Sequence, residues 1–135
     1  MTKLYSKNVP FVPRFMQQLN RLIFATDIPR SVQIGQDTKF AHSGLGCVIH
    51  EKAVIGKNCK LLQNVTVGGR GKHGTPVIGD NVLIGDNVLI GDNATIAGGI
   101  KVGNNATIGA MSLVIEDVPE GATVVGIPAK PIQTR

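Results

Sequence analysis

The residues best suited to chemistry are a histidine at position 42, a carboxylate at position 27 and a glycine-rich run that begins at position 68. Histidine is the side chain whose ordinary pKa lies nearest to neutrality, so it can take up a proton at pH 7. A carboxylate such as Asp27 can hold one ring nitrogen of an imidazole and stabilise the cation that forms. In the run Gly68-Gly69-Arg70-Gly71-Lys72, the glycines allow close backbone approach and the basic side chains can bind phosphates.

The composition predicts one folded domain with an uneven charge. The chain has 135 residues, of which 42% are hydrophobic and 17% are charged, so it carries enough aliphatic side chains to fold. Its net charge of +5 comes from residues 1–75, whereas residues 76–135 are net acidic. This distribution argues against a uniform nucleic-acid-binding surface and favours a local anion site. With no recognisable signal peptide or membrane-spanning apolar run, Cys47 and Cys59 are expected to be reduced core residues of a cytoplasmic protein.

A six-residue repeat organises the chain from residue 28 onward. Its clearest copies are the segments Ile-Gly-Asp-Asn that begin at positions 78, 84 and 90. A period of six does not fit the 3.6-residue turn of an α-helix, but it fits short parallel strands separated by turns, with one aliphatic side chain per strand pointing inward. The first position of each copy is large and apolar: Ile28, Ile34, Phe40, Ile49, Ile55, Leu61, Val67, Ile78, Ile84, Ile90, Ile96, Val102, Ile108 and Val114. The repeat therefore predicts an all-β solenoid.

Two interruptions break the phase of this repeat. The step from Phe40 to Ile49 is nine residues, and the step from Val67 to Ile78 is eleven. In a solenoid, insertions form loops on one face, which is frequently the binding face. The first interruption follows His42 and the second, the predicted loop 68–77, contains the glycine-rich run. Both candidate regions for chemistry therefore lie where the repeat is broken.

Four segments of the sequence resemble a known family. They are Asp27-Ile28-Pro29, Phe40-Ala41-His42-Ser43-Gly44, the run from Gln63 to Lys72, and Val125-Gly126-Ile127-Pro128-Ala129-Lys130. In this order they resemble the hexapeptide-repeat acyltransferases, and most of all the serine acetyltransferase branch with its short relatives from polysaccharide gene clusters. The resemblance implies a left-handed parallel β-helix with three hexads per coil of about 18 residues. It also implies acetyl-CoA as acyl donor and a homotrimer with active sites between subunits.

The resemblance gives roles to the histidine and the carboxylate. With a coil of about 18 residues, Asp27 and His42 should fall near the same corner in successive layers about 4.8 Å apart. In the family an Asp at this spacing orients the catalytic His, which would remove the proton from an acceptor hydroxyl as its oxygen attacks the thioester. Neither cysteine lies where a nucleophile would stand, so direct transfer is expected rather than an acyl-enzyme.

The acyl donor should be held by the glycine-rich loop and by residues near the C-terminus. Backbone N–H groups at Gly68 and Gly69 can approach the thioester and stabilise the developing oxyanion. Candidates for the contacts with coenzyme A are Gly68, Gly69, Arg70, Lys72, the backbone at Ala110, and Lys130.

The acceptor is predicted from the places where the resemblance fails. Serine acetyltransferases carry an Asp immediately before the catalytic His, and an Arg-His pair after the glycine-rich loop. Here Ala41 precedes His42, and Gly74-Thr75 stands before Pro76. Because serine would lose charged contacts, a sugar hydroxyl of a surface polysaccharide or its precursor is the expected acceptor. Serine O-acetylation is the first alternative, and a non-catalytic β-helix scaffold is the second.

The two remaining histidines leave other roles open. His50 is either an acceptor-pocket residue or a plain turn residue. A metal is not expected, because the spacing of His42, His50 and His73 does not match the three ligands of the β-helical carbonic anhydrases.

The predicted organisation has three parts. Residues 1–26 form an N-terminal cap with one amphipathic helix over 13–25, residues 27–118 form the β-helix, and residues 119–135 form a C-terminal tail. The cap covers the open first coil or, through Lys3, Lys7, Arg14 and Arg21, contacts an anionic surface at the inner face of the membrane.

Overall fold

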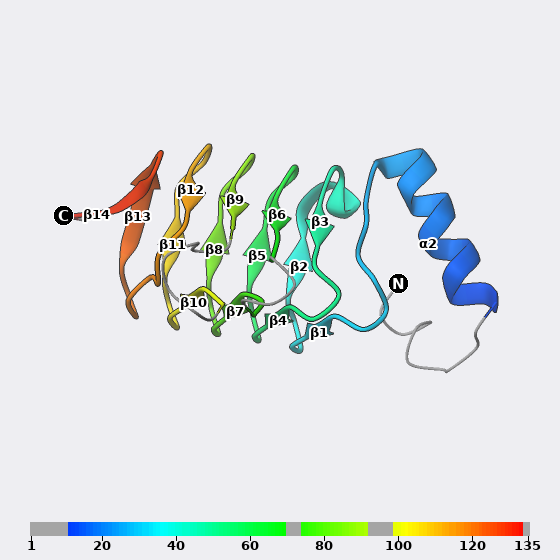
Figure 1. Cartoon of the computed structure of the whole chain (residues 1–135), viewed down its shortest axis with the longest axis horizontal. Coiled ribbons are helices and arrows are strands. Elements are labelled where there is room, and N and C mark those ends of the chain that lie inside the picture. Colours follow the sequence, from blue (N-terminus) through cyan, green and yellow to red (C-terminus); the bar gives the residue numbers. More distant parts are fainter. Residues whose placement is uncertain (1–10, 70–73, 92–98, 134–135) are drawn as a thin grey trace.

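The computed structural model of the chain describes residues 11–69, 74–91 and 99–133. It begins with helix α2 (Phe11–Phe24), and a series of very short strands follows. Figure 1 shows the strands stacked along the long axis, with α2 at one end and the C-terminus at the other. The strands are β1 (Gln33–Ile34), β2 (Lys39–Phe40), β3 (Val48–Ile49), β4 (Val54–Ile55), β5 (Lys60–Leu61), β6 (Thr66–Val67), β7 (Val77–Ile78), β8 (Leu83–Ile84), β9 (Leu89–Ile90), β10 (Lys101–Val102), β11 (Thr107–Ile108), β12 (Leu113–Val114), β13 (Thr123–Gly126) and β14 (Ala129–Ile132).

The strands form three sheets that we call sides 1, 2 and 3. Side 1 has the order β1-β4-β7-β10, side 3 has the order β3-β6-β9-β12, and side 2 runs from β2 through β5, β8, β11 and β13 to β14. All pairs are parallel except β13 with β14. From β1 to β12, successive strands of the chain enter successive sides, so three strands complete one coil. This arrangement confirms the predicted parallel β-helix of hexapeptide repeats with a short N-terminal helix.

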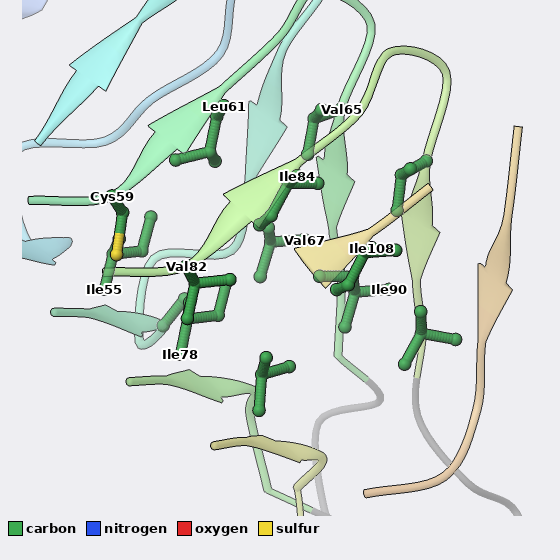
Figure 2. Packing of buried hydrophobic residues seen from close by; sticks show 14 of the residues in the cluster. Ile55, Cys59, Leu61, Val65, Val67, Ile78, Val82, Ile84, Ile90 and Ile108 are labelled. Atoms are coloured by element: carbon green, nitrogen blue, oxygen red, sulfur yellow. The ribbon is translucent and has the colours of Figure 1, made fainter. Parts of the chain in front are cut away.

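The first positions of the repeat form the core. Strand by strand, one residue points inward and stacks on its counterpart in the next coil, as Leu61 does on Ile84. Figure 2 shows these side chains filling the interior, together with smaller residues from the fifth position of the six-residue repeat, such as Cys59, Val65 and Val82. Burial of one Ile or Leu side chain stabilises a fold by about 1.5–3 kcal/mol. The aliphatic ladder is therefore the main source of stability for the coil.

A third interruption of the repeat was not predicted. The step from Ile90 in β9 to Val102 in β10 is twelve residues, because β10 pairs with β7 and closes the next coil. Ile96, which the pattern places at an inward position, lies outside the described residues. A coil needs only six residues at this step, so six extra residues enter at the same edge as the glycine-rich loop.

The end of this third interruption packs closely on the end of the glycine-rich loop. A Cβ added to Gly99 would lie 2.5 Å from the carbonyl carbon of Thr75 and 2.8 Å from its backbone nitrogen, whereas a Cβ added to Gly91 would meet no described residue within 4 Å. We expect Gly99→Ala to lower the free energy of unfolding by about 1–3 kcal/mol through overpacking. The matched control Gly91→Ala should leave it nearly unchanged. Thermal melting of the two variants tests this, and equal melting temperatures would contradict the close packing.

Helix α2 lies at the open end of the solenoid, but its apolar side points away from it. The exposed fractions are 57% for Phe15, 84% for Leu22 and 59% for Ile23. Contact with the coil is instead made by polar side chains, because the amide of Gln17 donates to Asp27 and Nε of Arg21 lies 4.0 Å from Oδ2 of the same carboxylate. The helix therefore has the position expected of a cap without burying its apolar side. No helix in the described ranges is long and apolar enough to cross a membrane.

The C-terminal residues continue the solenoid on side 2. Strand β13 stacks in parallel on β11, and β14 then pairs with β13 in the antiparallel direction. The region predicted as a tail thus contributes two strands of the longest sheet, and β14 covers the edge of β13 that would otherwise remain unpaired.

Both cysteines are buried and free, as predicted. Burial raises the pKa of the Cys47 thiol above its ordinary value, although backbone hydrogen bonds from Val65 and Asn64 act in the opposite direction. A group whose pKa is raised by folding stabilises the folded state fully below the unfolded pKa, about 8.5, and this contribution is lost as pH rises through the folded pKa. We therefore expect the free energy of unfolding to fall as pH rises above the unfolded pKa of about 8.5. Urea titrations should show a smaller fall for Cys47→Ala, and identical slopes would contradict this account.

Candidate functional site

His42 stands in a strained turn between sides 2 and 3. It belongs to the 3-10 turn Ala41–Gly44, which joins β2 to β3, and its φ and ψ are 52° and 37°. Ser43 is also left-handed, with φ of 58°. Such conformations are costly for residues other than glycine and are concentrated at functional sites. The imidazole is exposed, and it has no hydrogen-bond partner among the residues that the structure describes.

Asp27 lies one layer below this turn. It forms a parallel bridge with Val48, donates its N–H to the carbonyl of Cys47 and accepts from the N–H of Ile49. The preceding Thr26 is buried, and its hydroxyl donates to the carbonyl of Gly44 at 2.7 Å. That bond ties the His42 turn to the Asp27 layer. The predicted placement at one edge, in successive layers, therefore agrees with the structure.

The hydrogen bond from Thr26 to Gly44 was not predicted from the sequence. A threonine next to an acidic residue was the available signal, but its partner lies a whole coil away.

The carboxylate of Asp27 is bound by the helix and makes no contact with His42. Its Oδ1 accepts from Gln17 Nε2 at 2.9 Å, and its Oδ2 lies 4.0 Å from Arg21 Nε. Within the described chain, the expected Asp–His hydrogen bond is therefore not formed. A carboxylate has about four lone-pair sites, so the bond from Gln17 leaves room for an imidazole N–H.

His50, Gly68 and Gly69 gather at a different edge, where the chain turns from side 3 to side 1. The Nδ1 of His50 accepts from the backbone N–H of Lys52 at 3.1 Å, which leaves Nε2 free to bind a ligand. A Cβ added to Gly69 would lie 3.5 Å from Cδ2 of His50. His50 and Gly69 are therefore close neighbours.

Among the described residues, the N–H of Gly68 has a partner and that of Gly69 has none. The N–H of Gly68 donates to the carbonyl of Ile90 at 2.9 Å as part of the coil ladder. The expectation that both glycines donate to an oxyanion is therefore corrected, because Gly68 is already used by the fold. The N–H of Gly69 has no partner in the part of the chain that is described.

The other predicted coenzyme residues are scattered or not described. Arg70 and Lys72 lie outside the described residues. Ala110 is exposed where the chain turns from side 2 to side 3, three coils beyond His42. The Nζ of Lys130 lies 3.5 Å from Oε1 of Glu116, and both side chains are exposed, so this ion pair contributes little to stability. One chain does not bring Ala110 or Lys130 beside Gly69.

The candidate residues are thus divided between the two edges of side 3. His42, Asp27 and Ala110 lie at the edge with side 2, whereas His50 and Gly69 lie at the edge with side 1. Between them, Val48 and Leu89 point outward from side 3 and are 41% and 44% exposed. A single chain therefore presents two half-sites separated by a partly apolar surface.

The positions that could bind a charged acceptor carry no charge. Ala41 precedes His42, and Gly74 is followed by Thr75, whose hydroxyl donates to the carbonyl of Lys52 at 3.0 Å. In the described ranges, no three His, Cys, Asp or Glu side chains are grouped closely enough to hold a metal ion. His73 lies outside those ranges, so the absence of a metal stays a prediction.

Comparison with known proteins supports the same fold. The family described as bacterial transferase hexapeptide (six repeats) matches residues 81–116. A serine acetyltransferase from Synechococcus elongatus is 39% identical over 132 residues, which cover 96% of this chain and 51% of the relative.

Solved structures agree with this relationship. A soybean serine acetyltransferase complexed with serine has a TM-score of 0.78 at 38% identity and covers 97% of this chain and 52% of its own. A serine acetyltransferase in complex with CoA has a TM-score of 0.77 at 34% identity, with coverage of 97% and 52%. The chain spans about half the length of the curated relatives it matches. With its hexad coils and the His42 turn above Asp27, the chain belongs to the hexapeptide-repeat acyltransferase superfamily, in its serine acetyltransferase-like branch.

Proposed function

We propose that this protein transfers an acetyl group from acetyl-CoA to a hydroxyl group. The observation that carries the proposal is the exposed His42 imidazole, held in a strained turn that Thr26 ties to the layer of Asp27. The similarity to a serine acetyltransferase solved in complex with CoA supports the choice of donor.

The proposed reaction is a direct transfer in a ternary complex. A neutral His42 accepts the hydroxyl proton while the acceptor oxygen forms a bond to the acetyl carbonyl carbon. The resulting oxyanion is stabilised by the N–H of Gly69. Collapse of the intermediate breaks the carbon–sulfur bond, and the imidazolium returns its proton to the leaving thiolate. Asp27 stabilises the imidazolium once its free lone pairs accept from the ring.

Serine is the acceptor that the relatives support. Those compared are serine acetyltransferases, and one is solved with serine. The sugar acceptor expected from the sequence gains no support from these relatives. It retains one argument from this chain, because Ala41 and Thr75 offer no charge to an amino acid's ammonium and carboxylate groups. Serine is therefore the first acceptor to test, and sugar hydroxyls are the second.

The experiment is an assay of thiol release from acetyl-CoA. The chain is supplied with serine, with a panel of sugars and oligosaccharides, and with no acceptor. Release that depends on an acceptor supports the transferase, and the best acceptor decides between the two classes. If no acceptor gives thiol release and the chain does not bind acetyl-CoA tightly, the non-catalytic scaffold is favoured.

We also propose that three copies of the chain complete the site. The two half-sites lie at opposite edges of side 3, so a head-to-tail ring would bring the His42 edge of one copy to the Gly69 edge of the next. The outward apolar residues Val48 and Leu89 support an interface on this side. A mass measured by light scattering should equal three chains, and a monomer at assay concentrations would contradict the shared site.

The expected location is the cytoplasm. The compared relatives lend no support to a membrane contact of residues 1–26.

A further inference from the structure

Helix α2 reaches the proposed site through one glutamine. The Nε2 of Gln17 donates to Oδ1 of Asp27 at 2.9 Å, across ten residues of sequence, in a partly buried position. The neighbouring Gln18 is exposed and makes no hydrogen bond with any described residue. Two adjacent glutamines on one helix therefore have entirely different environments.

The bond to Gln17 limits how the carboxylate can turn. Without it, Asp27 would be free to rotate about its side-chain torsions, because its other neighbour, Arg21 Nε, lies 4.0 Å from Oδ2. A donor held on Oδ1 reduces this freedom and leaves further lone pairs for an imidazole N–H. The His42 turn lies in the next layer, tied there by Thr26. Gln17 is thus placed to present the carboxylate toward that layer.

The orientation of the helix is consistent with this role. Burying the apolar side of α2 would be the ordinary way to attach an amphipathic helix. Instead, Leu22 and Phe15 are exposed, while Gln17 and Arg21 lie next to Asp27. The attachment therefore preserves the contact between helix and carboxylate.

We propose that Gln17 is a positioning residue, which holds the Asp27 carboxylate in the orientation that His42 requires during acetyl transfer. The inference rests on the proposed function. Gln17 acts through Asp27 and touches neither donor nor acceptor.

The test compares Gln17→Ala with Gln18→Ala in the full chain. Gln17→Ala should lower kcat by about tenfold or more while KM for both substrates changes little, because orientation of a catalytic group affects the transition state more than binding. Gln18→Ala, one residue away on the same helix, should leave kcat and KM unchanged. An equal loss in both variants would overturn the proposal, since it would reflect the helix in general.

A double-mutant cycle with Asp27→Asn separates positioning from general stability. If Gln17 acts through the carboxylate, Gln17→Ala should cause no further loss of kcat when Asp27 is already replaced. An undiminished loss in that background would overturn the role. Unchanged turnover in Gln17→Ala, beside a large loss in Asp27→Asn, would overturn it as well while leaving the proposed function intact.

The contact itself can be tested without activity. The side-chain amide resonance of Gln17 should shift in Asp27→Asn, whereas that of Gln18 should not. If both behave as expected but the unaltered chain releases no thiol with any acceptor, the proposed function fails and the helix contact remains.

Discussion

Replacing His42 with asparagine should lower kcat for acetyl transfer by about 100- to 10,000-fold, the usual contribution of a general base. Asparagine is chosen because it tolerates the left-handed backbone, which is φ 52° at this position, and because it cannot take up a proton at pH 7. The loss should therefore arise from proton transfer and not from misfolding of the turn. Steady-state thiol release from acetyl-CoA measures it.

The control for this variant is a test that its fold and oligomeric state are unchanged. Circular dichroism, melting temperature and oligomeric mass should match those of the unaltered chain, because the imidazole is exposed and has no hydrogen-bond partner in the described ranges. His50→Asn provides a second comparison. A smaller effect confined to the KM of the acceptor would assign His50 to the acceptor pocket, and no effect would make it a turn residue. Undiminished turnover in His42→Asn would rule out the proposed mechanism.

Replacing Ile84 with alanine should lower the free energy of unfolding by about 2–5 kcal/mol. Ile84 is completely buried in the centre of side 2, where it stacks between Leu61 and Ile108 of the neighbouring coils (Figure 2). Its removal would open a gap in a ladder that has inward residues on every side and no loose segment to fill the space. Urea unfolding followed by circular dichroism measures the change.

The matched control is the preceding residue of the same strand. Leu83 points outward and is 41% exposed, so Leu83→Ala removes less buried area than Ile84→Ala does. It should cost about 1 kcal/mol, because only part of its side chain leaves an apolar environment and no cavity opens in the core. Equal losses for Leu83→Ala and Ile84→Ala would contradict the inward and outward alternation on which the coil depends.

The sequence and the relatives favour different acceptors. Uncharged residues stand where serine acetyltransferases carry charged ones, which favours a sugar, whereas the compared relatives favour serine. The preference for a sugar rests on the uncharged Ala41 and Thr75, so direct measurement of acceptors decides between the two classes.

Much of the architecture could be read from the sequence because each coil depends on local rules. A side chain every six residues must point inward, and Asn58, Asn81 and Asn105 occupy left-handed turn positions that asparagine accepts more readily than most residues. The same rules predicted buried cysteines and loops after Phe40 and Val67. The layer relation between Asp27 and His42 followed from the coil length that the family implies.

Other features depended on tertiary structure, each for a physical reason. An insertion of six residues between Ile90 and Val102 keeps the repeat in phase, so the pattern cannot reveal it, and only the pairing of β10 with β7 does. Gly68 was expected to donate to a ligand, but its N–H is used by Ile90 in the next coil. The Gln17–Asp27 bond joins the helix to the coil, and it could not be predicted because it depends on how α2 is rotated against the coil. The sequence by itself thus determined the repeating strands of the β-helix and which residue types could do chemistry. The three-dimensional packing alone decided which of their polar groups remain free and at which edges they meet, because those depend on partners a coil or more away.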